Sequence, residues 1–199
     1  MKSKRTLIFW IVVVTFFASI LLGQQYLKQQ GSDLIPGNGG DFTLQSDKGP
    51  VSLSDFRGKV VALYFGYMSC PDICPTSLWN LSSALRLMTP EQAAQVQGIF
   101  VSVDPDRDSP KAMGMFVKGF WNSFIGLTGK KENIDKIARQ YSVVYEKVPL
   151  KDSAMGYVID HSSVIYLIDK KGVVQYYTPH NTAPEELRDD LLKLIEADD

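Results

Sequence analysis

The residues best suited to chemistry in this sequence are its only two cysteines, Cys70 and Cys74. They stand in residues 66–76, GYMSCPDICPT. A disulfide between two residues so close in sequence would remove little entropy from the unfolded chain, so a purely structural bridge explains the pair poorly. The spacing is better explained by thiol chemistry, either disulfide exchange or the binding of a soft metal ion.

The elements on either side of the cysteines predict how they are held. Residues 60–66 are apolar, β-branched and aromatic, which predicts a buried strand. Residues 75–88 have apolar side chains at helical spacing, and Pro75 suits a first helical position. The pair therefore lies on a strand-to-helix turn, where cysteines four residues apart can reach each other or one metal ion. Helix-start N–H groups favour thiolates, and we expect Cys70, ahead of the helix, to be the more exposed, attacking thiol.

The N-terminus predicts that this chemistry takes place outside the cytoplasm. Positive charges in residues 1–5 precede an uncharged apolar run at 6–23, whose length falls within the roughly 17–25 residues that cross a bilayer as a helix. Because the positive side stays inside, we expect a cytoplasmic tip at 1–5, a transmembrane anchor at 6–23 and a linker at 24–40. Residues 41–199 then form an exported domain, in a periplasm or on the outer face of the cell. A cleaved signal peptide is the alternative, and it also implies export.

The rest of the sequence predicts an α/β domain. We expect strands at 98–103 and 124–127, helices at 109–120, 132–141 and 184–197, and a hairpin of strands at 164–168 and 173–177. Short strands at 42–44 and 51–53 predict an N-terminal β-hairpin extension, and residues 147–160 a mobile loop. The order of elements is that of a thioredoxin-like fold, in which helices flank a central mixed sheet.

Histidine is scarce, and one of the two histidines lies where this fold approaches the cysteine turn. His161 precedes the strand at 164–168. Alone, such a histidine is more often a hydrogen-bonded structural residue, but beside an exported cysteine pair the ligand role is favoured. Two thiolates and one imidazole form a soft set that suits Cu(I) and can hold Cu(II). Zinc generally takes a fourth protein ligand or a catalytic opening, so copper is the predicted metal.

Other candidate ligands have simpler explanations. His180 stands between a proline and an asparagine, which predicts a solvated turn residue. Met68 and Met155 offer thioethers, but packing explains each of them better.

Alternating aspartates at Asp104, Asp106 and Asp108 could suggest a hard-cation site. Arg107 in their midst and the helix start at Ser109 favour a capped structural loop instead. Such a loop could shape the surface near the metal or meet a partner.

Composition excludes one class of partner. The 199 residues are 45% hydrophobic and 22% charged, and the formal net charge is −1. Nucleic-acid-binding proteins usually carry a basic face, and nothing in this sequence supplies one, so we expect no nucleic-acid partner.

Three ordered motifs resemble those of the Sco/SenC family, copper-handling proteins of cytochrome oxidase assembly. Residues 70–76, CPDICPT, resemble its CxxxC signature; residues 103–110, VDPDRDSP, its second signature; and residues 160–163, DHSS, its third, which carries a metal-binding histidine. The similarity extends from about residue 41 to 197, and an N-terminal anchor fits it.

The resemblance implies the metal ligands and also the client protein. By it, Cys70, Cys74 and His161 bind copper, the cysteines cycle between dithiol and disulfide, and the client is the dinuclear copper centre of an oxidase subunit. We therefore expect a copper-binding metallochaperone in the assembly of cytochrome c oxidase, with copper binding coupled to the redox state of the pair. An exported copper chaperone as donor, or a thiol reductant, would be a further partner.

Two other functions remain open. A thiol–disulfide oxidoreductase could reduce the cysteines of the oxidase copper site or of another exported copper chaperone, because thiolates that bind copper also exchange disulfides. A typical thioredoxin-type reductant has a CxxC pair and a cis-proline facing it. This sequence has CxxxC, and residues 161–168 contain no proline, which favours metal binding over general disulfide exchange. A peroxiredoxin is the weakest candidate, since CxxxC with His161 is not its usual arrangement.

Overall fold

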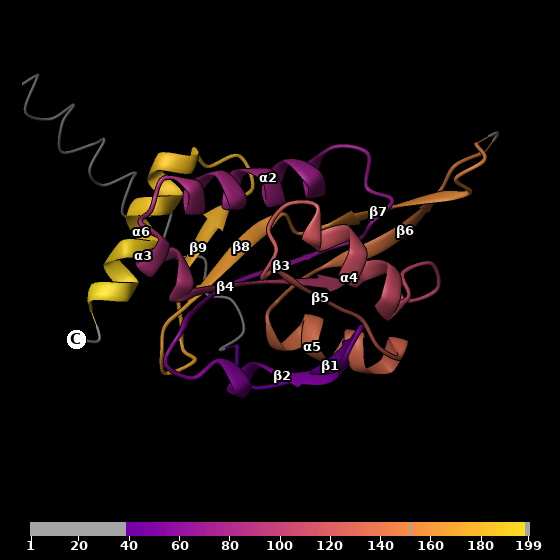
Figure 1. The fold of residues 1–199 in the computed structure, drawn as a ribbon. Coiled ribbons are helices and arrows are strands. Elements are labelled where there is room, and N and C mark those ends of the chain that lie inside the picture. Colours follow the sequence, from indigo (N-terminus) through magenta and orange to yellow (C-terminus); the bar gives the residue numbers. More distant parts are fainter. Residues whose placement is uncertain (1–38, 152, 198–199) are drawn as a thin grey trace, which may run out of the picture. The chain divides into compact units, whose positions relative to one another are not determined.

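The computed structural model of the protein describes residues 39–151 and 153–197 (Figure 1). A central sheet has the strand order β5-β4-β3-β8-β9. Its strands are β3 (Val60–Gly66), β4 (Val96–Ser102), β5 (Ile125–Leu127), β8 (Val164–Ile168) and β9 (Val174–Pro179). β4 runs parallel to β3 and β5, whereas β8 is antiparallel to β3 and β9. The predicted α/β fold with a central mixed sheet is confirmed.

The middle strand of this sheet, β3, and its parallel neighbour β4 form the buried base of the cysteine turn. Every residue of β3 and β4 is buried. Near-continuous apolar runs are what a parallel pair covered on both faces requires. Gly66 and Ser102 pair at the carboxyl ends of the two strands, the edge at which open α/β sheets bind ligands.

Helices cover both faces of the sheet. They are α2 (Ile73–Arg86), α3 (Pro90–Ala94), α4 (Pro110–Lys118), α5 (Lys131–Gln140) and α6 (Pro184–Glu196). Figure 1 shows α2 and α6 together on one face and α5 on the other. The apolar stripe of α2 is buried at Leu78, Leu81 and Leu85, as its helical spacing predicts.

The predicted helices are confirmed with small changes at their ends. α2 begins at Ile73, so Cys74 lies inside the first turn rather than before it. Ser109 caps α4 by accepting a hydrogen bond from the Ala112 N–H. The short α3 was not predicted; a Thr89 capping box and Pro90 at its first position start it.

The N-terminal hairpin predicted at 42–44 and 51–53 is also confirmed. β1 (Thr43–Ser46) pairs antiparallel with β2 (Gly49–Ser52), and a 3-10 turn, η1 (Leu53–Phe56), follows. Gly49 closes the hairpin turn with a φ of 122°, a conformation that glycine adopts without strain.

The segment predicted as a mobile loop is instead a second hairpin. β6 (Tyr145–Pro149) pairs with β7 (Tyr157–His161) in a separate two-stranded sheet. The prediction of a loop was wrong for the strand residues of 147–160, because Ile159 alone is buried in these two strands and several of their side chains are charged, so the sequence shows no run of buried apolar residues. His161 is therefore the last residue of a strand and not part of a loop.

The predicted anchor at 6–23 and most of the linker at 24–40 lie outside the described residues. Among residues 39–151 and 153–197, no helix is long and apolar enough to cross a membrane.

Candidate metal centre

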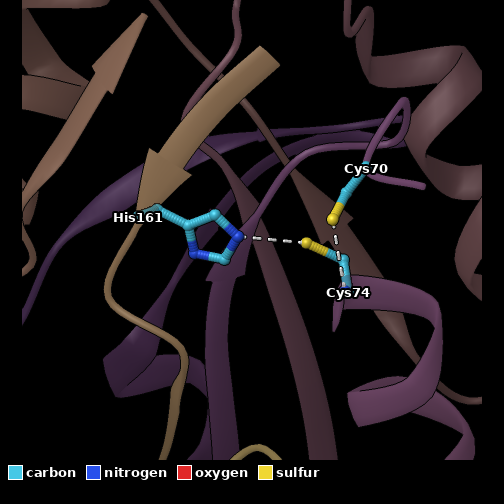
Figure 2. A group of neighbouring side chains, drawn as sticks. All are labelled: Cys70, Cys74 and His161. Atoms are coloured by element: carbon cyan, nitrogen blue, oxygen red, sulfur yellow. Dashed lines mark hydrogen bonds between the residues drawn. The ribbon is translucent and has the colours of Figure 1, made fainter. Parts of the chain in front are cut away.

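Three side chains converge at the carboxyl end of the central sheet (Figure 2). The Cys74 Sγ lies 3.3 Å from the His161 Nε2, and the Cys70 Sγ lies 3.4 Å from the Cys74 backbone nitrogen. The two Sγ atoms and a ring nitrogen all lie within 4.8 Å of one another. Among the described residues, these three form the one group of histidine, cysteine and acidic side chains close enough to share a metal ion.

Local backbone structure sets the positions of the two thiols. The Cys70 N–H donates to the Tyr67 carbonyl, which closes a turn after β3. N–H groups in the first turn of a helix have no carbonyl partner within the helix. The N–H of Cys74 is one of them, and it donates to the Cys70 Sγ. Gly66 leaves the room that the buried sulfur needs, because a Cβ there would lie 2.6 Å from the Cys74 Sγ.

His161 is oriented by its own ring hydrogen bond. Its Nδ1 lies 3.0 Å from the Ser162 carbonyl oxygen. A carbonyl can only accept, so Nδ1 carries the hydrogen, and the lone pair of Nε2 faces the two thiols as a donor that could coordinate a metal. The imidazole also has edge-to-face contacts with the rings of Tyr64 and Tyr67, at centroid distances of 6.1 and 5.9 Å.

The two thiols have opposite electrostatic environments. A hydrogen bond from the Cys74 side chain, helped by the Cys74 N–H, holds the pKa of Cys70 far below that of an ordinary thiol. The bond to Cys70, together with burial, raises the pKa of Cys74. The lower pKa therefore belongs to the half-buried Cys70 and the higher one to the fully buried Cys74. The predicted greater exposure of Cys70 is confirmed.

A cleft of about 360 Å³ gives access to the site from outside. Cys70 and His161 line it, together with Tyr67, Ile73 and Val158. A partner molecule can therefore reach the thiolate and the imidazole from one side, while Cys74 lies beneath them.

The other sequence candidates lie apart from this group. His180 lies in a turn, as predicted, and is partly buried there; its N–H donates to the Ser163 carbonyl. Met68 packs against the core, as predicted. Met155 is 39% exposed between β6 and β7, so the prediction that it packs was wrong.

The aspartate loop after β4 has a structural role, as predicted. Asp104 and Asp108 are buried, and each accepts hydrogen bonds from neighbouring side chains or backbone. Asp106 is exposed and pairs with Lys147. Among the described residues, no group of side chains close enough to share a metal ion includes these carboxylates.

Sequence reasoning missed the residues that support the cysteine turn and the histidine strand. The Tyr67 hydroxyl accepts from the Ile159 N–H at 3.2 Å, and Asp108 accepts from the Met68 N–H at 3.0 Å. Nothing in their spacing reveals these contacts. The one sequence feature that could have pointed to this supporting loop is Arg107, which stands among three aspartates ahead of a helix.

Fold and site together define a thioredoxin-like domain with a CxxxC-plus-histidine centre. A profile of the SCO1/SenC family matches residues 32–196. The chain belongs to the SCO1/SenC family.

Individual proteins of this family align over most of the chain. It is 39% identical to the mitochondrial SCO2 homolog of Bos taurus over 79% of its length, and 36% identical to the SCO2-like protein RC0895 of Rickettsia conorii over 75%. The alignments cover 60% and 73% of those two proteins, so the chain spans less than two thirds of the bovine relative. The structure of Bradyrhizobium japonicum ScoI with copper bound aligns with a TM-score of 0.71 at 39% identity, over 79% of this chain and 99% of the other.

Proposed function

We propose that this protein is a copper-binding metallochaperone that takes part in assembling the copper centre of cytochrome c oxidase. Cys70, Cys74 and His161 are the proposed ligands. The observation that carries the proposal is the convergence of two sulfurs and one ring nitrogen within 4.8 Å, with the Nε2 atom of His161 free of its ring hydrogen. The copper in the related Bradyrhizobium structure, and the family to which the chain belongs, support copper as the metal.

The donor set itself favours copper over other metals. Thiolate and imidazole ligands are soft or intermediate, whereas magnesium and calcium take oxygen ligands. A structural zinc site would take a fourth protein ligand, and the described residues offer no further cysteine, histidine or acid in the group. Three-coordinate copper, in particular Cu(I), fits the three donors that are present.

Copper binding is linked to the protonation and the redox state of the two thiols. Copper binds thiolates, so loading the site releases any protons that the two thiols hold, and the lowered pKa of Cys70 favours its thiolate form. Oxidation of the pair removes two electrons and any remaining thiol proton, forms a Cys70–Cys74 bond and removes two of the three ligands. A disulfide in a partner protein is the class of oxidant that can accept those electrons. Copper affinity therefore depends on the redox state of the pair.

The proposed setting is the outer side of a cytoplasmic membrane. The charge and apolar pattern of residues 1–23 supports a single-pass anchor with its N-terminus inside, followed by a linker to residue 40. Residues 41–199 would then face the periplasm or the cell exterior. The proposed partners there are the copper-bearing oxidase subunit and either an exported copper donor or a thiol reductant.

A second function is favoured by one specific observation. Cys70 is half-buried, lines the cleft and has a lowered pKa, which are properties of an attacking thiol. We therefore keep thiol–disulfide oxidoreductase activity on the oxidase copper site or on an exported chaperone as the alternative.

A copper titration of three proteins separates these functions. The reduced wild type should bind one copper, and the disulfide form should bind none tightly. His161→Ala should weaken binding by at least about 100-fold, the upper end of what changes outside the ligand set cause. His180→Ala, which changes the other histidine, is the matched control and should bind like wild type. Copper affinity that is indifferent to both His161 and redox state would contradict the metallochaperone and leave the oxidoreductase.

A further inference from the structure

The strand that carries His161 has no strand pairing with the central sheet. Among the described strands, β7 pairs with β6 alone. At the base of this hairpin, the Ser162 N–H donates to the Val144 carbonyl. These bonds hold the hairpin together, but they do not fix its angle to the cysteine turn. The position of His161 relative to the thiols therefore depends on the short link through Ser162 and Ser163 to β8, and on side-chain contacts between the hairpin and the core.

Arg107 supplies several of these contacts from the loop after β4. Its Nη1 donates to the carbonyl of Met155 at 3.2 Å and to that of Tyr157 at 3.1 Å. Its guanidinium carbon also lies 3.7 Å from the centroid of the Tyr157 ring. One side chain thus binds the backbone and a side chain at the start of β7, four to six residues before His161.

A buried carboxylate fixes Arg107 in turn. The Asp104 Oδ2 accepts from the Arg107 Nε, and the Asp104 Oδ1 accepts from the Tyr157 hydroxyl at 2.7 Å. The Asp104 side chain is fully buried, whereas that of Arg107 is 23% exposed. A buried ion pair is weak evidence of stabilisation, since desolvation offsets much of its attraction. Its geometric effect is clearer, because the planar guanidinium can bind Asp104 and two carbonyls at once.

The same loop also holds the other half of the site. The Asp108 Oδ2 accepts from the Met68 N–H, two residues before Cys70, and from the Ser102 hydroxyl at 2.6 Å. One short segment, Asp104 to Asp108, therefore contacts both the cysteine turn and the histidine strand.

We propose that Arg107 is a positioning residue for His161: by clamping the start of β7 to Asp104, it sets the distance of the imidazole from the two thiols and so tunes copper affinity. The proposal rests on the proposed function, because it needs His161 to be a ligand. It makes no claim that Arg107 touches the metal.

The test is a double-mutant cycle with copper alone as the probe. Arg107→Lys keeps a positive charge beside Asp104 but loses the fork that reaches the two carbonyls. The affinity of the reduced protein for copper is measured for this variant with His161 present and with His161→Ala. Lys147→Gln is the matched control, because it removes an exposed ion pair between the same hairpin and the same loop, and a second cation over the Tyr157 ring, while the Arg107 contacts stay in place.

We expect Arg107→Lys to weaken binding by about 10–100-fold when His161 is present, the range found for residues that orient metal ligands. In the His161→Ala background it should have no effect, because the group it positions is gone. The nitrogen coupling in the electron paramagnetic resonance spectrum of the Cu(II)-loaded protein should weaken in the same variant. Lys147→Gln should match wild type in all of these measurements.

An equal loss of affinity in both backgrounds would show a merely structural role and overturn the proposal, as would wild-type affinity in Arg107→Lys. If this variant does not fold, Asp104→Asn with Arg107→Gln removes the buried charges together and takes its place in the cycle. Failure of both to fold also overturns the proposal. If copper binding ignores His161 while Arg107 is intact, the proposed function has failed, and this inference fails with it.

Discussion

Gly66→Ala is a small change that should act directly on the candidate metal centre. Gly66 ends β3, and a Cβ added there would lie 2.6 Å from the Cys74 Sγ and 2.8 Å from the Phe100 Cε2. Comfortable contacts between such atoms are about 3.5–4.0 Å. The sulfur or the strand must therefore move by about 1 Å, and neither has free space because both lie in the buried core.

Gly66→Ala should lower both the stability of the protein and its copper affinity. Overpacking of a buried site generally destabilises a protein by about 1–3 kcal/mol. In a domain of this size, each kcal/mol lowers the Tm by about 2–4 °C, so we expect a decrease of about 2–12 °C. The displaced Cys74 sulfur should also weaken copper binding by about 10–100-fold, as disturbances next to metal ligands do.

Gly98→Ala provides the matched control for the assay. Gly98 lies on β4 opposite Ala62, and a Cβ there would lie 2.4 Å from the Phe124 ring, far from the thiols along the strand. Calorimetry and copper titration of the two reduced variants should show that both lose stability but only Gly66→Ala loses copper affinity. Equal copper affinity in a folded Gly66→Ala protein and in wild type would refute the reasoning about Cys74.

Three further results are expected. Iodoacetamide should modify Cys70 and spare Cys74. Because the pKa of Cys70 is lowered, the rate of its modification should be constant near pH 7 and fall only as the pH drops through that pKa. A rate that climbs tenfold per pH unit above 7 would contradict this expectation. Cys74→Ser should abolish tight copper binding in a titration, and wild-type affinity in that variant would disprove the ligand assignment. Leu81→Ala, in the buried stripe of α2, should lower the free energy of unfolding by about 2–5 kcal/mol in urea, and a loss below about 1 kcal/mol would contradict its place in the core.

The parts of the fold that could be predicted are those with a strong apolar pattern. Residues 60–66 form a strand with the predicted bounds, because every side chain in it is buried. The helix predicted at 75–88 occurs at Ile73–Arg86, where one apolar stripe faces the core. The β6–β7 hairpin was missed because its strands are short, Ile159 alone is buried in them, and Glu146, Lys147 and Asp160 interrupt the apolar pattern that reveals a strand.

The candidate site could likewise be predicted only in part. The two thiols could be found because they are four residues apart, next to a strand and a helix, and His161 because the sequence offers only two histidines. The contacts of Arg107 with Met155 and Tyr157 join residues some 50 positions apart. Such pairs become neighbours only through the tertiary fold, and no local pattern in a single sequence encodes them.

The most direct test of the central claim is X-ray absorption spectroscopy at the copper edge of the reduced protein loaded with one copper. We expect a ligand shell of two sulfurs and one imidazole nitrogen. The nitrogen signal should disappear in His161→Ala and persist in His180→Ala. A shell without sulfur, or an imidazole signal that survives the loss of His161, would contradict the assignment of Cys70, Cys74 and His161 as the copper site.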